Sequence, residues 1–248
     1  MIPKVIHYCW FGRNPLPESA LKCIESWKEY LPDYTIKEWN EDNFDIAQNR
    51  YVREAYEHRK YAFVSDYARL YALYTEGGIY MDTDVEMVGS YDAFLHHPAF
   101  SGFETDGNVS TGVMAAQKGS LWAKALLEQY DGRQFVMDDG TFDMTTNATV
   151  ISAWMAAKGL KMNNEYQEIE GLCAIYPTEY FCPKDHRTGR IHCTPNTVCI
   201  HHFVGSWIEF SRWEAFRHNS KMLLAKVLGG KVTTFLADLV TLRVFKKK

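Results

Sequence analysis

Three acidic residues, Asp82, Asp84 and Glu86, occupy every second position in the stretch GGIYMDTDVEMV, residues 77–88. Two glycines and a short apolar run precede the first acid, a pattern that is typical of a buried strand. Side chains alternate between the two faces of a strand, so we expect the three carboxylates to point to the same side. Carboxylates this close repel one another, and burying them unpaired is costly. A positively charged partner is therefore expected beside them.

Two carboxylates at positions i and i+2, at the end of a strand, can hold a hard divalent cation. Magnesium and manganese prefer oxygen ligands and commonly share them with substrate phosphates. Such an ion would stabilise a leaving diphosphate. An isolated Asp-x-Asp also occurs in solvated loops, but the double glycine and the apolar lead-in favour a site. Asp82 and Asp84 are therefore predicted ligands of Mn²⁺ or Mg²⁺.

A second pair of charges precedes this stretch. Asp66 and Arg69 lie one helical turn apart in a segment, residues 51–76, that we expect to be mostly helical and to end at Gly77-Gly78. The planar guanidinium of arginine suits recognition of phosphates and hydroxyls. A simple ion pair within the helix is the alternative interpretation.

The order of the predicted elements explains how these residues could meet. Residues 5–10 read as a strand, Pro17 opens a helix, and residues 34–40 alternate like a second strand. Residues 79–81 form another short strand, with Asp82 at its carboxyl end. Ligands collect at the carboxyl ends of strands in α/β sheets. The sequence thus predicts an α/β fold with the acids at the ligand-binding edge.

Composition narrows the class of protein. The 248 residues are 46% hydrophobic, enough for one large globular domain. A net charge of −4 and a pI near 6.1 argue against a nucleic-acid binder. We see no N-terminal signal sequence and no apolar run near the roughly 18 residues that span a bilayer.

Six scattered cysteines without a CxxC pair favour free thiols in a reducing cytoplasm, so we expect a cytoplasmic protein. A zinc site from Cys193, Cys199 and His201 is the alternative interpretation, although their spacing matches no common zinc site.

The segment SDYARLYALYTEGGIYMDTDV resembles the core motif of DXD-containing sugar transferases of glycosyltransferase family 32. That family includes bacterial capsular-polysaccharide enzymes and yeast mannosyltransferases, and it is distantly similar to the glucosyltransferase domains of large clostridial toxins. IPKVIHYCWFG near the N-terminus and IHHFVGSW near residue 205 are similar to the family's opening and closing motifs. The resemblance implies a type-A glycosyltransferase (GT-A) fold, a Rossmann-like mixed sheet flanked by helices. It also implies a nucleotide-sugar donor, Mn²⁺ or Mg²⁺, and retention at the anomeric carbon.

The resemblance also implies roles for single residues. Trp10 matches a tryptophan that stacks on the donor base, Asp66 an aspartate that binds sugar hydroxyls, and Arg69 an arginine near the sugar and diphosphate. Asp82 matches the first DXD acid, which lies near the ribose and the metal. Asp84 matches the second, which binds the metal directly. His202 matches a further metal ligand, and its position three residues before Gly205 makes it preferred to His201. Trp207 matches a tryptophan that covers the diphosphate. Asp66, Arg69, Asp82 and Asp84 are the predicted catalytic set.

Part of the family pattern is missing. Several relatives carry Gly-Pro where this chain has Thr146-Asn147. Asn147 is assigned to the donor sugar. The sequence offers no obvious nucleophilic carboxylate, which agrees with a front-face mechanism in which the leaving phosphate assists the acceptor hydroxyl.

The C-terminal segment differs from the rest of the chain. We predict a GT-A catalytic domain over residues 1–210 and a helical appendage over residues 211–248. Apolar residues recur at helical spacing from Trp213 onward, with Lys and Arg between them and three lysines at the end. This composition suits a helix that lies on an anionic membrane surface, so peripheral contact through residues 213–248 is predicted. Packing of this helix on the catalytic domain is the alternative.

Together these observations predict a retaining hexosyltransferase of bacterial surface-polysaccharide synthesis. A UDP-sugar is the favoured donor, with GDP-mannose as the alternative. The expected acceptor is a saccharide, either free or linked to a lipid. No nucleic-acid partner is expected. A non-catalytic carbohydrate-binding protein and a haloacid-dehalogenase-type phosphatase are the competing interpretations. A phosphatase of that type would carry its Asp-x-Asp near the N-terminus, unlike this chain.

Overall fold

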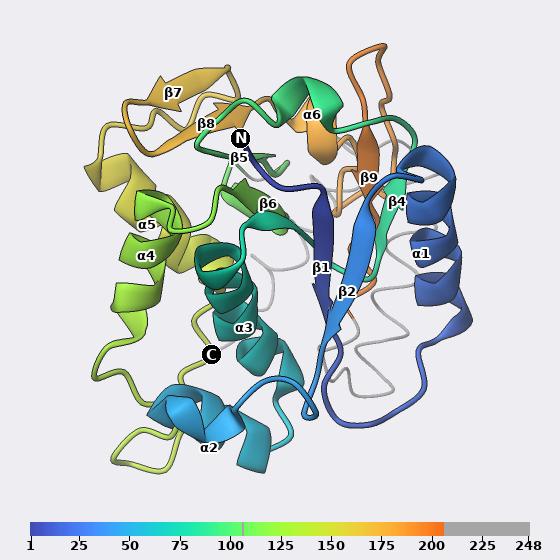
Figure 1. The fold of residues 1–248 in the computed structure, drawn as a ribbon. Helices are drawn as coiled ribbons and strands as arrows, with labels where there is room; N and C mark the ends of the chain where they lie inside the picture. Colours follow the sequence, from blue (N-terminus) through green and yellow to red (C-terminus); the bar gives the residue numbers. More distant parts are fainter. Residues whose placement is uncertain (106, 206–248) are drawn as a thin grey trace, which may run out of the picture.

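The computed structural model describes residues 1–105 and 107–205, in which strands and helices are interspersed along the chain (Figure 1). The predicted appendage over residues 211–248 lies outside the described residues. The strands are β1 (Val5–Cys9), β2 (Thr35–Trp39), β3 (Gly78–Met81), β4 (Val85–Met87), β5 (Ala99–Phe103), β6 (Val109–Ala116), β7 (Gln167–Ile169), β8 (Cys173–Tyr176) and β9 (Cys199–His201).

Seven of these strands form one mixed sheet in the order β2-β1-β3-β6-β5-β8-β7. Strand β1 runs parallel to both β2 and β3, whereas β6 runs antiparallel to β3 and β5. Strands β5 and β8 are parallel, and β7 is antiparallel to β8. Strands β4 and β9 form a separate antiparallel pair. The predicted mixed α/β sheet is therefore confirmed.

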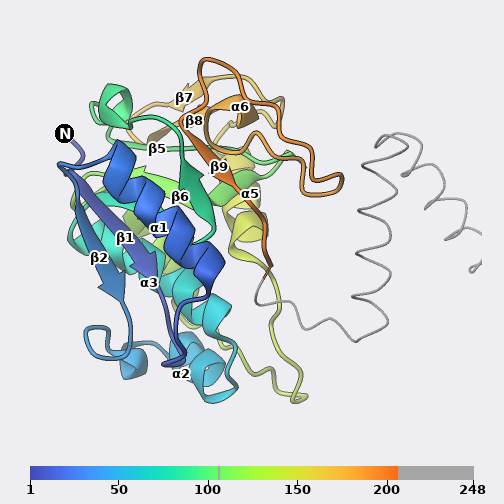
Figure 2. The same ribbon diagram turned by 90° about the vertical axis from the view of Figure 1, so that its right-hand side faces the viewer.

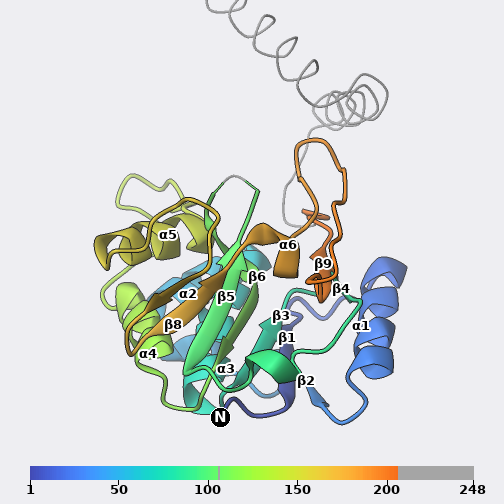
Figure 3. The same ribbon diagram turned by 90° about the horizontal axis from the view of Figure 1, so that it is seen from above.

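Helices cover both faces of the sheet (Figure 3). The α-helices are α1 (Glu18–Tyr30), α2 (Arg50–Glu57), α3 (Tyr61–Thr75), α4 (Leu121–Leu127), α5 (Asn147–Ala157) and α6 (Thr178–Phe181). Short 3-10 turns occur at η1 (Ile46–Gln48), η2 (Asp92–Phe94) and η3 (Glu128–Tyr130). Helix α1 lies on one side and α2 to α5 on the other, and each side has its own buried apolar cluster.

Strand β3 shows how the alternation of side chains builds this arrangement. Tyr80 points into the cluster under α2 to α5, and its neighbours Ile79 and Met81 point into the cluster under α1. All three are buried, as expected for a strand covered on both faces. The strand therefore presents its carboxyl end, rather than a face, to solvent.

The double glycine before β3 is required by close packing. Gly77 and Gly78 have positive φ angles of 71° and 121°. A Cβ atom on Gly78 would lie 2.6 Å from the carbonyl oxygen of Val5 on the neighbouring strand. Since only glycine fits such a backbone without strain, helix α3 can end and β3 can begin within two residues.

The prediction that residues 51–76 are mostly helical is confirmed, because α2 and α3 fill most of this segment and are separated by residues 58–60. One local prediction is wrong. Asp82, Thr83 and Asp84 do not continue β3 but form a turn, in which the N–H of Val85 donates to the carbonyl of Asp82 over 3.0 Å. The alternation that we expected to place Asp82, Asp84 and Glu86 on one face therefore ends at Met81.

Within the described parts of the chain, every helix is too short or too polar to cross a bilayer.

Candidate active site

The turn of Asp82 and Asp84 lies at the carboxyl end of β3, between the main sheet and the β4–β9 pair. The N–H of Asp82 donates to the carbonyl of Gly112 on β6 over 2.9 Å, which fixes the start of the turn on the main sheet. Strand β4 begins directly after the turn and pairs with β9. Both aspartates are thus held between two sheets.

Strand β9, which Figure 2 draws in orange, comes from a distant part of the sequence. It brings a histidine to this turn. His201 is the register partner of Val85. The chain then continues along Asp84, because the N–H of His202 donates to the Asp84 carbonyl over 3.0 Å and the N–H of Val204 donates to its Oδ2 over 2.7 Å. These contacts fix the carboxylate of Asp84 and the imidazole of His201 side by side.

The ligand atoms of three residues converge here. His201 Nε2 lies 3.3 Å from Asp84 Oδ1 and 3.9 Å from Asp82 Oδ2, and all three atoms lie within 4.8 Å of one another. His201 Nδ1 faces away from the acids, 4.0 Å from Cys182 Sγ. Two carboxylates and an imidazole are a donor set that suits Mn²⁺ or Mg²⁺ shared with a phosphate ligand. The residues therefore fit the predicted metal.

Asp84 and His201 shift each other's pKa in opposite directions. Burial by itself would raise the pKa of Asp84, but its ion pair with His201 and the hydrogen bond from Val204 lower it to about 2. Burial likewise disfavours the charged form of His201, yet the Asp84 carboxylate and the Cys182 thiol raise its pKa well above the ordinary value. The carboxylate of Asp84 and the protonated form of His201 thus stabilise each other, and a divalent cation bound between them would replace that proton.

Arg69 is the positive partner that the sequence required. Its Nη2 atom lies 3.0 Å from Asp66 Oδ1 and 3.5 Å from Asp82 Oδ1. Nη1 donates to the carbonyl of Thr111 over 2.6 Å, and the guanidinium lies 4.5 Å from the centre of the Tyr80 ring. Arg69 is only 5% exposed. It therefore connects α3 to the DXD turn, rather than forming only a surface ion pair within a helix.

Asp66 has an unusual electrostatic environment. Burial raises its pKa to about 6, although Arg69 acts in the opposite direction. The hydroxyl of Tyr80 donates to Asp82 Oδ1 over 2.7 Å, so the two carboxylates share Arg69 but differ in their other partners.

Asn147 lies close to Asp66 but does not offer a free amide. Its Nδ2 donates to the backbone carbonyl of Asp66 over 3.1 Å, and its Oδ1 accepts a hydrogen bond from Tyr130. The residue is 2% exposed. The contact fixes the start of α5 against α3.

Trp10 lies at the same edge of the sheet as Asp82, since it follows β1 and that strand is parallel to β3. Its indole is half-buried, and Nε1 donates to the carbonyl of Asn14 over 2.6 Å. Trp207, predicted to cover the diphosphate, lies outside the described residues.

His202, which the sequence favoured as the metal ligand, is not part of the three-residue group. Its Nε2 lies 2.7 Å from Glu86 Oε2, and the structure brings the alternative, His201, to the two aspartates. The spacing before Gly205 favoured His202, but the register of β4 and β9 decides which imidazole faces the turn.

Sequence analysis also did not find Tyr80, Gly112 and Cys182, which contact Asp82 or His201. Tyr80 had a signal, since it lies two residues before Asp82. The other two come from separate strands or loops, and nothing in their local sequence marks them.

The cysteines do not form the alternative zinc site. Cys193 is exposed, whereas Cys199 is buried and its Sγ accepts a hydrogen bond from Tyr91. In residues 1–105 and 107–205, Asp82, Asp84 and His201 form the group of potential metal ligands, and all six cysteines are free thiols as predicted.

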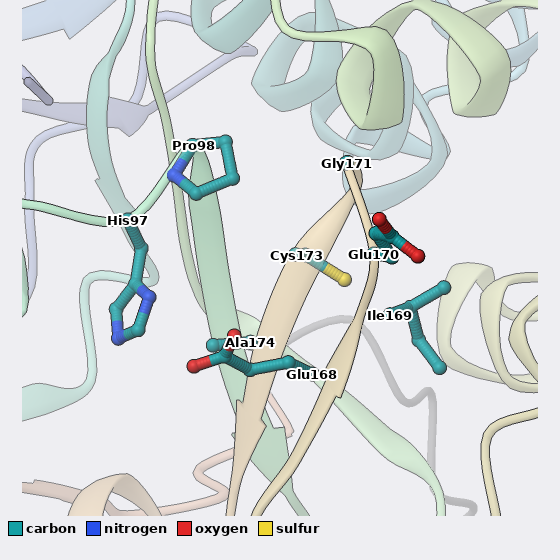
Figure 4. Close-up of a pocket in the computed structure, with 8 residues that line it drawn as sticks. All are labelled: His97, Pro98, Glu168, Ile169, Glu170, Gly171, Cys173 and Ala174. Atoms are coloured by element: carbon teal, nitrogen blue, oxygen red, sulfur yellow. The ribbon is translucent and has the colours of Figure 1, made fainter.

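A shallow hollow of about 250 Å³ lies beside the first residues of β8, with His97, Glu168 and Cys173 in its lining (Figure 4). The first residue of β5 and the first residue of β3 both pair with Ala116 on β6. The hollow is therefore at the end of the sheet opposite to Asp82, and it takes no part in the site.

The chain is similar in sequence to two yeast proteins. The chain is 31% identical over 122 residues to inositol phosphoceramide mannosyltransferase 3 of Schizosaccharomyces pombe, covering 48% of this chain and 34% of that protein. It is 29% identical over 120 residues to mannosyl phosphorylinositol ceramide synthase CSH1 of Saccharomyces cerevisiae, covering 47% and 32%. The chain thus spans about a third of the length of these curated relatives.

Among solved structures, a glycosyltransferase involved in the glycosylation of the major capsid of PBCV-1 aligns with a TM-score of 0.48 and 14% identity, over 88% of this chain and 100% of that one. Residues 17–101, which include Asp66, Arg69, Asp82 and Asp84, match the family model described as the glycosyltransferase sugar-binding region containing a DXD motif.

Proposed function

We propose that this protein is a metal-dependent glycosyltransferase that moves a hexose from a nucleotide-sugar donor to a saccharide acceptor. The observation that carries the proposal is the convergence of Asp82, Asp84 and His201 at the end of β3. Two of these residues belong to the segment that matches the glycosyltransferase family model. A purely structural turn would have no need of three converging ligand groups with a buried arginine beside them.

In this proposal the DXD turn and His201 hold Mn²⁺ or Mg²⁺. The ion would supply positive charge to the leaving diphosphate. The chain's own contribution is the position of the ligands. The turn holds the carboxylates of Asp82 and Asp84, while β9 holds the imidazole of His201 against them. His201 would hold the ion through Nε2, because Nδ1 is directed at Cys182.

Arg69 and Asp66 are proposed to bind the donor sugar. Arg69 pairs with both Asp66 and Asp82, so helix α3 is fixed relative to the turn. Asp66 can accept a hydrogen bond from a sugar hydroxyl when it is ionised. Asn147 supports this pair through the backbone of Asp66 and is a positioning residue rather than a direct donor contact.

We further propose that transfer retains the anomeric configuration. The acids of the site already have partners: Asp66 and Asp82 pair with Arg69, and Asp84 pairs with His201. Such paired carboxylates are poor nucleophiles, which supports a front-face reaction in which the leaving phosphate accepts the proton of the acceptor hydroxyl.

Two donors are supported by different observations. The resemblance at Trp10 favours a UDP-sugar, whereas the printed names of two yeast relatives favour a mannosyl donor such as GDP-mannose. The same names refer to ceramide lipids, which supports a lipid-linked saccharide acceptor. Synthesis of bacterial surface polysaccharide, a cytoplasmic location and membrane contact through residues 213–248 stay predictions from the sequence.

A donor screen tests the proposal. The protein is incubated with UDP-glucose, UDP-galactose, UDP-N-acetylglucosamine and GDP-mannose, with manganese or with a chelator, and release of the nucleoside diphosphate is measured. We expect one donor to be consumed only when manganese is present. Cleavage of simple phosphomonoesters instead would identify a phosphatase. Binding of free saccharides without turnover of any donor would identify a carbohydrate-binding protein.

A further inference from the structure

Gly112 on β6 lies directly against the imidazole of His201. A Cβ atom built on Gly112 would lie 2.7 Å from His201 Cε1, 2.8 Å from Nδ1 and 3.2 Å from Nε2. Distances below 3.0 Å are not tolerated between a Cβ and another heavy atom, so one of the two residues would have to move. The ring of His201 thus occupies the space that any other residue at position 112 would fill.

The backbone does not explain the glycine. Gly112 does not have a positive φ angle, and its backbone is extended as part of β6. An alanine could adopt this conformation without strain. The reason for glycine at this position is therefore the close approach of His201.

The same residue also contacts the DXD turn. The carbonyl oxygen of Gly112 accepts the hydrogen bond from the N–H of Asp82 over 2.9 Å. One residue of β6 therefore touches both sides of the proposed metal centre, through its carbonyl toward Asp82 and through its Cα toward His201.

His201 has little room to move aside. Its ring centre lies 4.1 Å from that of Phe203, its Nδ1 lies 4.0 Å from Cys182 Sγ, and the residue is 7% exposed. A methyl group at position 112 would therefore displace the whole buried imidazole of His201 and shift its Nε2 atom relative to Asp82 and Asp84. Well-packed interiors transmit such shifts because they contain few voids.

We propose that Gly112 is a positioning residue of the metal centre, which sets the distance between His201 Nε2 and the two aspartates. This inference rests on the proposed metal-binding function and extends it to a residue outside the ligand set. Residues that orient metal ligands typically change metal affinity by about 10- to 100-fold when they are replaced.

Gly112→Ala is the direct test, and Gly102→Ala is its matched control. Gly102 lies in the neighbouring strand β5, and its Cβ would lie 3.0 Å from the ring of Phe181, so the control crowds a core aromatic ring instead of a ligand. The dissociation constant of Mn²⁺ is measured by calorimetry on the full chain, and thermal unfolding without metal checks the fold of each variant. We expect Gly112→Ala to weaken Mn²⁺ binding at least about tenfold and Gly102→Ala to leave it within about twofold.

The second measurement is a double-mutant cycle with His201→Ala, which removes the ring that Gly112 accommodates. We expect Gly112→Ala to lower the melting temperature in the original chain and to have little effect in the His201→Ala background. This cycle decides the question even if the single variant folds poorly.

The outcomes separate the two levels of the proposal. Equal Mn²⁺ affinity of Gly112→Ala and the original chain, or an equal melting-temperature loss in both backgrounds, would overturn the role of Gly112 and leave the metal site intact. Failure of the original chain to bind Mn²⁺ would instead refute the metal site, and the inference with it.

Discussion

His201 Nε2 lies 3.3 Å from Asp84 Oδ1, although the two residues come from distant parts of the chain. The contact exists because β4, which begins immediately after the DXD turn, pairs with β9 so that Val85 faces His201. A short two-stranded ribbon, separate from the main sheet, thus determines which side chain joins the aspartates. The candidate site is a product of this pairing as much as of the Asp-Thr-Asp sequence itself.

The first prediction distinguishes the two adjacent histidines. His201→Ala should weaken Mn²⁺ binding by more than the roughly 10- to 100-fold typical of residues that only orient ligands, since it removes a direct ligand, whereas His202→Ala should change it little, because His202 pairs with Glu86. Calorimetry with Mn²⁺ on both variants measures this. The opposite order of affinities would restore His202 as the ligand and exclude the arrangement in the structure.

The second prediction concerns the buried cation. Arg69→Met should lower the free energy of unfolding by about 3–5 kcal/mol, because it leaves the carboxylates of Asp66 and Asp82 without their shared partner. Urea unfolding followed by circular dichroism measures the loss. Lys22→Met is the control, since the ion pair of Lys22 with Glu18 is highly exposed and such pairs contribute little. Similar losses for both variants would mean that Arg69 has no special structural role.

The third prediction follows from the raised pKa of Asp66. Its pKa is about 6 in the folded protein against an ordinary value of 3.8, so between these values the folded state holds a proton that the unfolded state has lost. The contribution of Asp66 to stability is therefore fully present below about pH 4 and declines as the pH rises through 6, by up to about 3 kcal/mol. Unfolding of the original chain and Asp66→Asn is compared from pH 4.5 to 7.5.

The test is how the difference in unfolding free energy between the two chains changes with pH. Its absolute size is not used, because Asp66→Asn also loses the contact with Arg69. A stability difference that stays constant across this range would show that Asp66 titrates normally in the folded chain.

The sequence predicts strand β3 and the charged pair beside it well. The apolar run before Asp82 and the double glycine locate β3, because a strand covered on both faces needs apolar side chains throughout and the turn into it needs glycine. The partner charge was also predictable, since Asp66 and Arg69 lie one turn apart on a helix that leads directly into β3.

The contacts between distant segments of the chain could not be predicted from the sequence. The choice of His201 over His202 depends on the register of β4 and β9, and a shift of one residue would turn the other imidazole toward the turn. The amide of Asn147 is taken up by the backbone of Asp66, a packing detail of α5 against α3. The role of Gly112 depends on the position of a ring from β9, which no local pattern encodes.

The most direct test of the central claim is metal-dependent binding of a nucleoside diphosphate. UDP and GDP are titrated into the protein by calorimetry, with Mn²⁺ and with a chelator, for the original chain, Asp84→Asn and Glu86→Gln. Glu86→Gln is the matched control, because Glu86 is an acid of the same region that pairs with His202 instead of joining the three-residue group. We predict that one nucleotide binds the original chain and Glu86→Gln only with Mn²⁺, and that Asp84→Asn loses this binding while it remains folded. Binding that is equally strong in the chelator, or that survives in Asp84→Asn, would contradict the claim that the DXD turn and His201 hold a metal for a nucleotide-sugar donor.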